Sequence, residues 1–441
     1  MVSAAVSESE SIRNRKVLLG IGYMVQGLRC FPWMGVNFFL KDGLRLEPST
    51  LQILQNSANL PMVIKPFYGI LSDSLYIFGQ HRVPYIALGA FLQAVSWIAI
   101  AIFASSGISL LSITFYLLLG NLGAAIVEVA NDAIVAETAG KPTSSRTLKT
   151  SSSGEIQSFV WMASSIGGVL GNLVGGIAID QFPPQKMFFI FGILLFIQFL
   201  ITLFTRENSL DLPKSQSHVG FRKQFLELVS ALKKPEILYS IIWFAFSYAL
   251  IPASMGTMFY YQTQHLKIHS SLLGLSKVFG QAAMLLWGAV YNRSLKSISS
   301  RKLISAVQIV MAVFMVSDFL FVKGVYKGLG IPDSVYVVVF SGLLEVLYFF
   351  KILPFSVLMA KLCPGGCEAS VMAFVMSAVA LAFIVSGYLG VALASYVGVN
   401  GDDFSGLPRG LLIQAVCTLL PVFWVSCIPE DVKEEHKSKK N

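Results

Sequence analysis

The sequence predicts an all-α integral membrane protein, a bundle of 12 transmembrane helices in two six-helix halves. Of its 441 residues, 55% are hydrophobic and only 13% are charged, whereas soluble globular proteins carry about 25% charged residues. Apolar runs of about 20 residues recur along the chain, and a helix of that length crosses a hydrocarbon core of roughly 30 Å. Because lipid offers the backbone no hydrogen bonds, each run must form a helix.

The longest polar connection, 206–234, separates the sixth predicted span from the seventh. Its last part, FRKQFLELVSALKK, is amphipathic, so we expect it to lie along the membrane surface. The predicted spans are 17–40, 49–72, 83–104, 109–136, 156–179, 187–205, 235–262, 270–291, 303–322, 334–360, 369–397 and 408–427. The expected parts are a tail at 1–16, a bundle at 17–205, a central loop at 206–234, a second bundle at 235–427 and a tail at 428–441.

The distribution of lysine and arginine predicts the orientation. With both termini in the cytoplasm, most of the 33 basic residues fall in inside segments. Only Arg29, Lys65, Lys277 and Lys351 lie within spans. The net charge of +9 is then explained by topology, without a nucleic-acid partner. The N-terminal segment has the features of neither a cleavable signal nor a transit peptide, so the sequence leaves the choice of membrane open.

The two halves resemble each other weakly. LRLEPSTL, from Leu44, aligns without gaps on LKIHSSLL, from Leu266, and each follows the first span of its half. Repeated halves are typical of secondary transporters, whose substrate site lies at the midplane between them.

The connection between the second and third spans, GILSDSLYIFGQHR, resembles the cytoplasmic signature of the major facilitator superfamily. The resemblance implies a major facilitator-like bundle. We expect Gly69 to allow close helix approach and Asp73 to pair with a basic group or a helix N-terminus. Gly69, Asp73 and Arg82 are therefore predicted to gate the cytoplasmic side. The alternative is a polar loop whose charges remain hydrated.

Several blocks resemble the folate–biopterin transporter family, and its plant members most. The blocks are VQGLRCFPWMGVNFFLKDGL, NSANLPMVIKPFYGILSD, EVANDAIVAE, GEIQSFVWMASSIGG and LCPGGCEASVMAFVMS, and the match runs from about Gly20 to Pro429. The resemblance implies alternating-access transport of folates or pterins, with proton coupling left open. The alternatives are a transporter of another organic anion, or a receptor or scaffold of the same fold that does not transport.

Three polar residues of the fourth span form one stripe. Asn121, Glu128 and Asp132 fall within about 40° of one another on a helix, and charged groups inside a span are functional candidates. A carboxylate there can bind the N–H groups of a pterin, or take up a proton because burial disfavours its charged form. The structural alternative is a helix–helix hydrogen bond. Asp132 is the leading candidate, and a permanently charged Asp132 would need Arg29 or Lys351 as its partner.

Cations in other spans are candidate counter-ions for an anionic substrate. Arginine binds carboxylates through two parallel hydrogen bonds, which favours Arg29 in the first span, and Lys351 in the tenth span is the second candidate. Glu345 is predicted to balance one of these cations.

The second span contributes Asn56 and Asn59 on one face, together with Gln52. Lys65 lies about 140° away from that face in helical phase. Pro61 and Pro66 can turn the helix between them, so Lys65 either reaches the cavity or extends to the inner surface. In the fifth span, Trp161 can stack on a pterin ring, or pack between helices.

Other patterns argue against further chemistry. GGVLGNLVGG resembles an antiporter motif, but Asn172 replaces its proline, and close helix packing explains the glycines. Cys363 and Cys367 have no third ligand nearby, so we expect reduced thiols rather than a metal site. We find no nucleotide-binding loop or catalytic cluster. The sequence thus predicts a monomeric protein in a lipid bilayer that is not an enzyme and needs no cofactor or metal.

Overall fold

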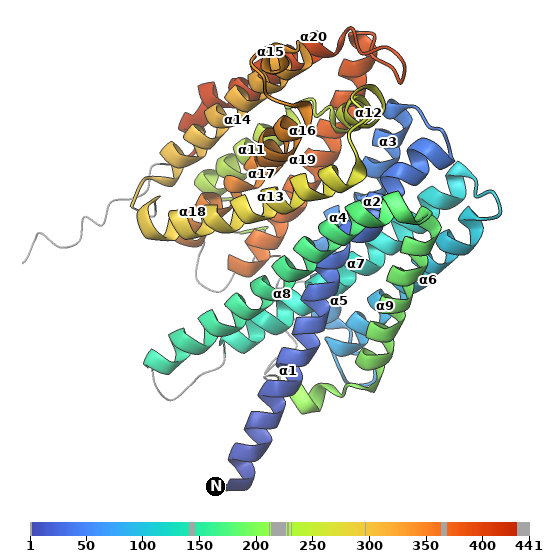
Figure 1. Ribbon diagram of the computed structural model, residues 1–441. Helices are drawn as coiled ribbons and strands as arrows, with labels where there is room; N and C mark the ends of the chain where they lie inside the picture. The colour runs from blue at the N-terminus through green and yellow to red at the C-terminus, as the bar shows by residue number, and fades with distance from the viewer. Residues whose placement is uncertain are drawn as a thin grey trace, which may run out of the picture. The chain divides into compact units, whose positions relative to one another are not determined.

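The computed structural model describes residues 2–140, 146–210, 212, 226, 229–230, 232–295, 297–362 and 368–429 (Figure 1). These residues are almost entirely helical. They form two compact units: one comprises Met1–Phe225 with His269–Val278, the other Leu226–Ile268 with Phe279–Asn441. Residues 221–225, 227–228 and 231 of the predicted amphipathic segment lie outside the described residues, as do both Cys363 and Cys367.

The described part of the first unit is built mainly from the first nine α-helices of the chain. They are α1 (Val2–Leu28), α2 (Cys30–Phe38), α3 (Pro48–Ala58), α4 (Leu60–Val63), α5 (Lys65–Ser74), α6 (Val83–Ala104), α7 (Leu110–Gly140), α8 (Arg146–Gln181) and α9 (Pro184–Phe204). A π-helical turn, Phe39–Gly43, follows α2, and a short 3-10 helix, Glu207–Leu210, follows α9.

The described part of the second unit is also helical. Its α-helices are α11 (Pro235–Ala249), α12 (Met255–Tyr260), α14 (Ser300–Val322), α15 (Val325–Gly328), α16 (Asp333–Tyr336), α17 (Gly342–Phe350), α18 (Ile352–Leu362), α19 (Glu368–Tyr396) and α20 (Leu407–Leu419). Helix α13 (Ser270–Val290) contributes its first residues to the first unit and the rest to the second. π-Helical turns at Tyr261–His265, Tyr291–Leu295 and Val337–Ser341 and a 3-10 helix at Leu420–Cys427 complete the helical segments.

In the described residues, nine helical segments are long and apolar enough to cross a membrane. The other three of the twelve predicted spans are interrupted: 17–40 at Arg29, 49–72 at Asn59 and Ile64, and 235–262 between Leu250 and Ser254. Proline explains most of these breaks, because it cannot donate a backbone hydrogen bond and fits only the first turn of a helix. Pro61 and Pro66 occupy the first turns of α4 and α5, and Pro252 lies in the non-helical stretch between α11 and α12.

Two helices begin earlier than the hydropathy predicts. Helix α1 starts at Val2, within the segment expected to be a tail, and α8 starts at Arg146 rather than near residue 156. Hydropathy marks only the apolar part of a helix, and a helix can continue beyond the hydrocarbon as long as its backbone hydrogen bonds are made.

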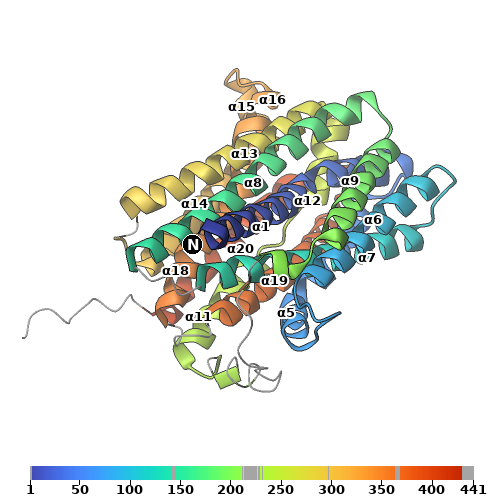
Figure 2. The same ribbon diagram turned by 90° about the horizontal axis from the view of Figure 1, so that it is seen from below.

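Helix pairs in the first unit cross closely at glycines. Helix α6 packs on both α7 and α9 (Figure 2), and a Cβ on Gly89 would lie 2.5 Å from the Gly123 carbonyl oxygen. Helix α1 runs along α8 (Figure 1), where a Cβ on Gly27 would lie 2.1 Å from the Ser164 oxygen. Only glycine permits such backbone proximity, so close packing accounts for these residues.

Aromatic stacking holds the core of the second unit together. Phe244 stacks on Phe355 with ring centroids 3.8 Å apart, and Trp287 stacks on Phe350 at 4.6 Å. These contacts fix α11, α17 and α18 around a buried lysine, Lys351, at the junction of α17 and α18.

Candidate functional site

Glu128 of α7 lies at the centre of a charged cluster in the first unit. Its Oε1 is 2.6 Å from Nη1 of Arg29, and its Oε2 contacts Nζ of Lys65. All three side chains are largely buried, with exposed fractions of 18% for Arg29, 28% for Lys65 and 10% for Glu128. Of the two paths open to Lys65, the structure shows the inward one.

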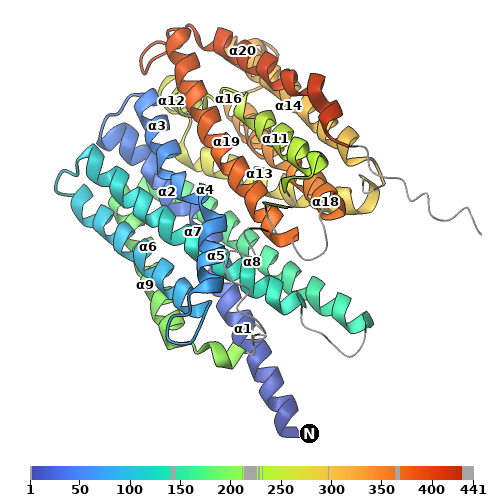
Figure 3. The same cartoon turned by 180° about the vertical axis from the view of Figure 1, so that it is seen from behind.

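The breaks in the first two spans bring both cations next to Glu128. Arg29 is the residue between α1 and α2, and Lys65 is the first residue of α5 after the break at Ile64. A continuous second helix would have placed Lys65 on a different face from Asn59. The turns before Pro61 and Pro66 reorient α5, which packs beside α7 (Figure 3).

Asn121 belongs to the same cluster and lies about two turns before Glu128 on α7. Its Oδ1 accepts a hydrogen bond from Arg29 Nη2 at 2.8 Å, and its Nδ2 donates to the Ala58 carbonyl at 2.6 Å and to Asn59 Oδ1 at 3.3 Å. Ala58 ends α3, so Asn121 satisfies a carbonyl near the helix break. Asn121 therefore orients Arg29 and stabilises the break.

Asp132 forms no ion pair with Arg29 or Lys65 in the described residues, and it lies on an exposed part of α7. The Tyr23 hydroxyl donates a hydrogen bond to its Oδ1. The carboxylate partner of Arg29 is Glu128 rather than Asp132, because Glu128 lies one turn nearer the α1–α2 break. Tyr23 was missed in the sequence, because nothing in the local pattern separates it from other tyrosines of the spans.

Two other predicted binding residues have different surroundings. The Nδ2 atom of Asn56 is buried without a hydrogen-bond partner among the described residues. Trp161 of α8 is 57% exposed, so packing between helices of its own unit does not account for it.

Lys351 belongs to the second unit and is fully buried. Its ammonium group lies 2.8 Å from Ser247 Oγ, 2.7 Å from Gln308 Oε1 and 3.9 Å from the centre of the Tyr248 ring. Within the described residues its contacts are all with neutral groups, so Glu345 does not balance it here. These neutral groups enclose the ammonium group of Lys351, so a ligand at the surface does not reach it.

Two of the three predicted gating residues, Asp73 and Arg82, form an ion pair. Arg82 contacts the carboxylate of Asp73, and its Nε and Nη2 lie 2.9 and 2.7 Å from Glu137 Oε1. Its Nη1 donates to Ser72 Oγ at 2.6 Å. A Cβ on Gly69 would meet only Val129, at an ordinary 3.5 Å, so close helix approach does not explain this glycine.

His81 and Glu207 extend the signature and were missed in the sequence. Glu207 Oε2 accepts the backbone N–H groups of His81 and Arg82, each at 3.0 Å, and its Oε1 lies 2.5 Å from His81 Nδ1. Burial opposes a charge on His81, but the hydrogen bonds that His81 donates to the carboxylates of Glu137 and Glu207 outweigh it and raise the pKa of His81 to about 9. Although Glu207 is also partly buried, the same contacts lower its pKa. Because its partners lie more than 100 residues away, no local signal indicated Glu207.

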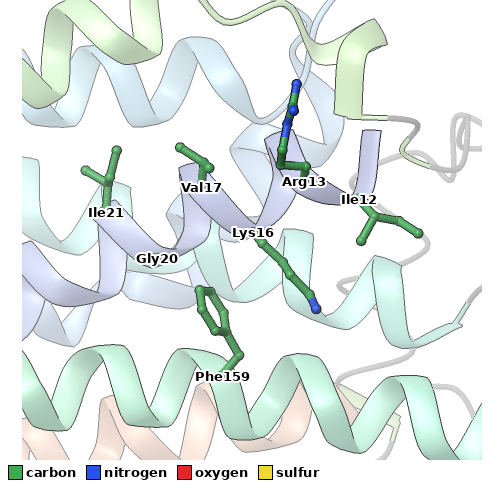
Figure 4. A pocket seen from close by; sticks show the side chains of 7 residues that line it. All are labelled: Ile12, Arg13, Lys16, Val17, Gly20, Ile21 and Phe159. Atoms are coloured by element: carbon green, nitrogen blue, oxygen red, sulfur yellow. The ribbon is translucent and has the colours of Figure 1, made fainter. Parts of the chain in front are cut away.

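An open groove of about 590 Å³ lies between α1 and α8, away from the charged cluster (Figure 4). Lys16 and Phe159 both point toward the space between the helices, and Gly20 leaves room for the Phe159 ring. None of the predicted binding residues lines this groove. A smaller crevice does adjoin Arg29 and Glu128, with Gln26, Gln93 and Gln198 among its lining side chains.

Comparison with known proteins identifies the family to which this chain belongs. The sequence pattern of the BT1 family matches residues 26–441. The chain belongs to the BT1 family. It is 61% identical over 435 residues to the probable folate-biopterin transporter 7 of Arabidopsis thaliana, covering 98% of this chain and 97% of that one. The folate-biopterin transporter of Synechocystis is 27% identical over 95% of this chain and 82% of its own length.

Solved structures show the fold of this BT1-family chain. The D-xylose-proton symporter matches with a TM-score of 0.68 and 14% identity, covering 95% of this chain and 98% of that one. The nucleoside transporter NupG matches with a TM-score of 0.65 and 16% identity, covering 95% and 98%. The predicted family and the predicted major facilitator-like fold are confirmed, and the protein is a multi-pass integral membrane protein of a transporter family.

Proposed function

We propose that this protein moves folates or pterins across its membrane by alternating access, coupled to protons, with Arg29 and Lys65 receiving an anionic group of the substrate. The names of its relatives, folate-biopterin transporters of a plant and a cyanobacterium, support the substrate class. The observation that carries the proposal is that two cations share one carboxylate, Glu128, inside the membrane-spanning part of the first unit.

The balance of charges links substrate to proton. Arg29 and Lys65 bring two positive charges, and Glu128 cancels one of them. An ionised Asp132 one turn away cancels the second, whereas a protonated Asp132 leaves one excess positive charge. Desolvated charge is costly in a membrane, so the protonated state favours binding of a carboxylate, and loss of the proton favours its release.

The cluster of Arg82 with Asp73 and Glu137 fits a role in alternating access. A charge pair at the cytoplasmic end of the helices stabilises one state only if it breaks in the other. The three side chains connect α5, the start of α6 and α7, so their separation would let these elements move independently.

Another organic anion is the second candidate substrate. The excess positive charge of Arg29 and Lys65 can bind a carboxylate or phosphate of any such molecule. It does not distinguish a pterin ring from another ring. Exposed Trp161 and the unpartnered Nδ2 atom of Asn56 are groups that can add ring recognition.

The test is uptake by the full-length protein in vesicles, with folate, a reduced pterin and an unrelated dicarboxylate measured side by side under an inward proton gradient. We expect folate or pterin uptake to dominate, and Arg29→Gln and Lys65→Gln to abolish it. Arg13→Gln, an exposed arginine on the same helix α1, is the matched control and should transport normally. Uptake of only the dicarboxylate identifies the alternative, and no uptake of any substrate identifies a scaffold.

A further inference from the structure

The second unit contains an acidic side chain that the transport mechanism above does not use. Asp318 lies on α14, one turn before the helix ends at Val322, and is 6% exposed. The Tyr336 hydroxyl donates a hydrogen bond to Asp318 Oδ1 at 3.0 Å. This is the one polar contact of the Asp318 carboxyl within the described residues, and it comes from a neutral group.

The surroundings of Asp318 offer no compensating cation. The titratable groups that interact with it are Tyr336 on α16 and Tyr348 on α17, and Tyr326 on α15 is connected to it through Ser317 and Tyr336. The next cation along α14, Lys323, lies about 140° around the helix. In the described part of the chain, the other titratable or charged groups on the elements packed against α14 have no hydrogen bond or ion pair with Asp318; they are Lys327, Glu345, Lys351, Lys361, Arg409, Cys417 and Cys427.

A buried carboxylate without a counter-charge is strongly disfavoured, and binding a proton removes the charge. Asp318 therefore differs from Glu128, which pairs with two cations. The neutral acid can also donate its new proton, which an ionised carboxylate lacks.

A chain of hydroxyl groups leads from Asp318 to less buried side chains. The Tyr336 hydroxyl lies 2.9 Å from Ser317 Oγ, and Ser317 Oγ lies 2.8 Å from the Tyr326 hydroxyl. Ser317 and Tyr326 are half-buried, whereas Tyr336 is fully buried. Hydroxyl groups both donate and accept, so a proton taken up at Tyr326 can release another at each step and reach Asp318, leaving every hydroxyl unchanged.

Aromatic stacking holds this chain in place. The Tyr336 ring stacks on Phe321 with centroids 4.1 Å apart and lies 5.1 Å from Phe340. The Tyr326 ring is 4.9 Å from the Tyr336 ring. These contacts fix the hydroxyl positions without drawing on any charge, which leaves Asp318 free to change protonation state without losing its scaffold.

We propose that Asp318 is a second proton-binding carboxyl of the protein, loaded through Tyr326, Ser317 and Tyr336 from the end of the second unit at which α14 terminates. One proton converts the carboxylate into the neutral acid, and no other bond changes. The consequence for transport rests on the proposed function, because a second proton site adds to the driving force of a proton-coupled cycle.

Infrared spectroscopy of the full-length protein in lipid tests the proton site without any substrate. We expect the carbonyl band of a protonated carboxylic acid, which Asp318→Asn removes and which declines as the pH is raised. Tyr336→Phe keeps the ring stack but deletes the hydrogen bond, so it should shift the band. Asp402→Asn, which removes an exposed carboxylate of the same unit, should leave it unchanged. A band that Asp318→Asn does not remove, or that ignores pH while the protein stays folded, overturns the proposal.

Transport supplies the second readout. With a substrate that the wild type takes up, Asp318→Asn and Tyr336→Phe should lose acceleration by an inward proton gradient while exchange without a gradient persists. Full acceleration in both variants contradicts the inference even if the infrared band is present. If none of the substrates is transported by the wild type, the proposed function fails, and the infrared result still decides the protonation of Asp318.

Discussion

At the scale of single residues, the charged cluster depends on Glu128 as the link between two cations. Arg29 is 99 residues and Lys65 is 63 residues away from it in the chain. Removing one partner of a buried charge pair leaves an uncompensated charge, which costs more than the pair itself contributes. The cluster is therefore expected to be sensitive to loss of the carboxylate and tolerant of paired changes.

Glu128→Gln should destabilise the protein by about 3–5 kcal/mol, because two largely buried cations lose their counter-charge. Adding Lys65→Gln should restore part of this loss by removing one of the stranded cations. Thermal unfolding in detergent, compared among the single and double variants, measures the effect. Equal melting temperatures for Glu128→Gln and the wild type would show that solvent screens the cluster.

Asp132→Asn keeps the size of the side chain but removes its charge and its titration. We expect it to abolish proton-driven uptake while the protein still reaches the membrane, because the excess positive charge of the cluster no longer depends on a proton. Uptake measured against pH in vesicles checks this, with Tyr23→Phe as the variant that leaves the carboxyl but deletes its hydrogen bond. A normal rate with a normal pH profile would make Asp132 structural.

At the scale of elements, Glu207 ties the 3-10 helix after α9 to the start of α6, and His81 links it to α7 through Glu137. The pKa of His81 rises from 6.5 to about 9. The folded state thus holds the proton more tightly than the unfolded state does. Because proton binding and folding are linked, the stabilising contribution of protonated His81 is complete below pH 6.5 and is lost as the pH rises through about 9.

The connection between α5 and α6 should therefore open more readily as the pH rises from 6.5 toward 9. Hydrogen exchange of the backbone N–H groups of His81 and Arg82 checks this, after correction for the intrinsic pH dependence of exchange. His81→Gln should exchange faster at acidic pH and lose most of the pH response. An unchanged pH response in that variant would assign the effect to another group.

Asp73→Asn weakens the contact between α5 and Arg82 but leaves Glu137 in place. We expect the protein to fold and the balance between inward-open and outward-open states to shift, because only a group that interacts differently with the two states can move their equilibrium. Conformation-dependent labelling of introduced cysteines on α5 measures the shift, and exposed Asp42→Asn is the control. If neither labelling nor transport rate changes, the signature is an ordinary hydrated loop.

At the scale of the whole molecule, the distribution of basic residues predicts both termini in the cytoplasm. The connection between α6 and α7 would then lie outside, and the 3-10 helix after α9 inside. Both contain exposed serines, Ser106 and Ser209, at which a cysteine can be introduced without disturbing buried contacts.

A membrane-impermeant thiol reagent should label Ser106→Cys but not Ser209→Cys in intact, right-side-out vesicles. The unmodified protein, with its five native cysteines, supplies the background. After the membrane is permeabilised, Ser209→Cys should react as well, which shows that the residue is accessible. The reverse labelling pattern would invert the predicted topology.

The sequence by itself determined the class of molecule, a helical membrane protein, and the polar stripe on the fourth span. These are local properties: hydropathy depends on neighbouring residues, and Asn121, Glu128 and Asp132 share a face because one helix carries all three. The family followed from blocks of sequence spread along the chain. Neither kind of information specifies which distant side chain each charge meets.

Only the tertiary structure decided the partners. The breaks at Arg29 and before Pro66 turn two helices so that their cations converge on Glu128, and a carboxylate one turn away, Asp132, receives a tyrosine instead. Lys351, a candidate counter-ion by sequence, is enclosed by neutral groups. A charge in a low-dielectric interior takes the partner that geometry brings within hydrogen-bond reach, and that geometry depends on helix packing between segments far apart in the chain.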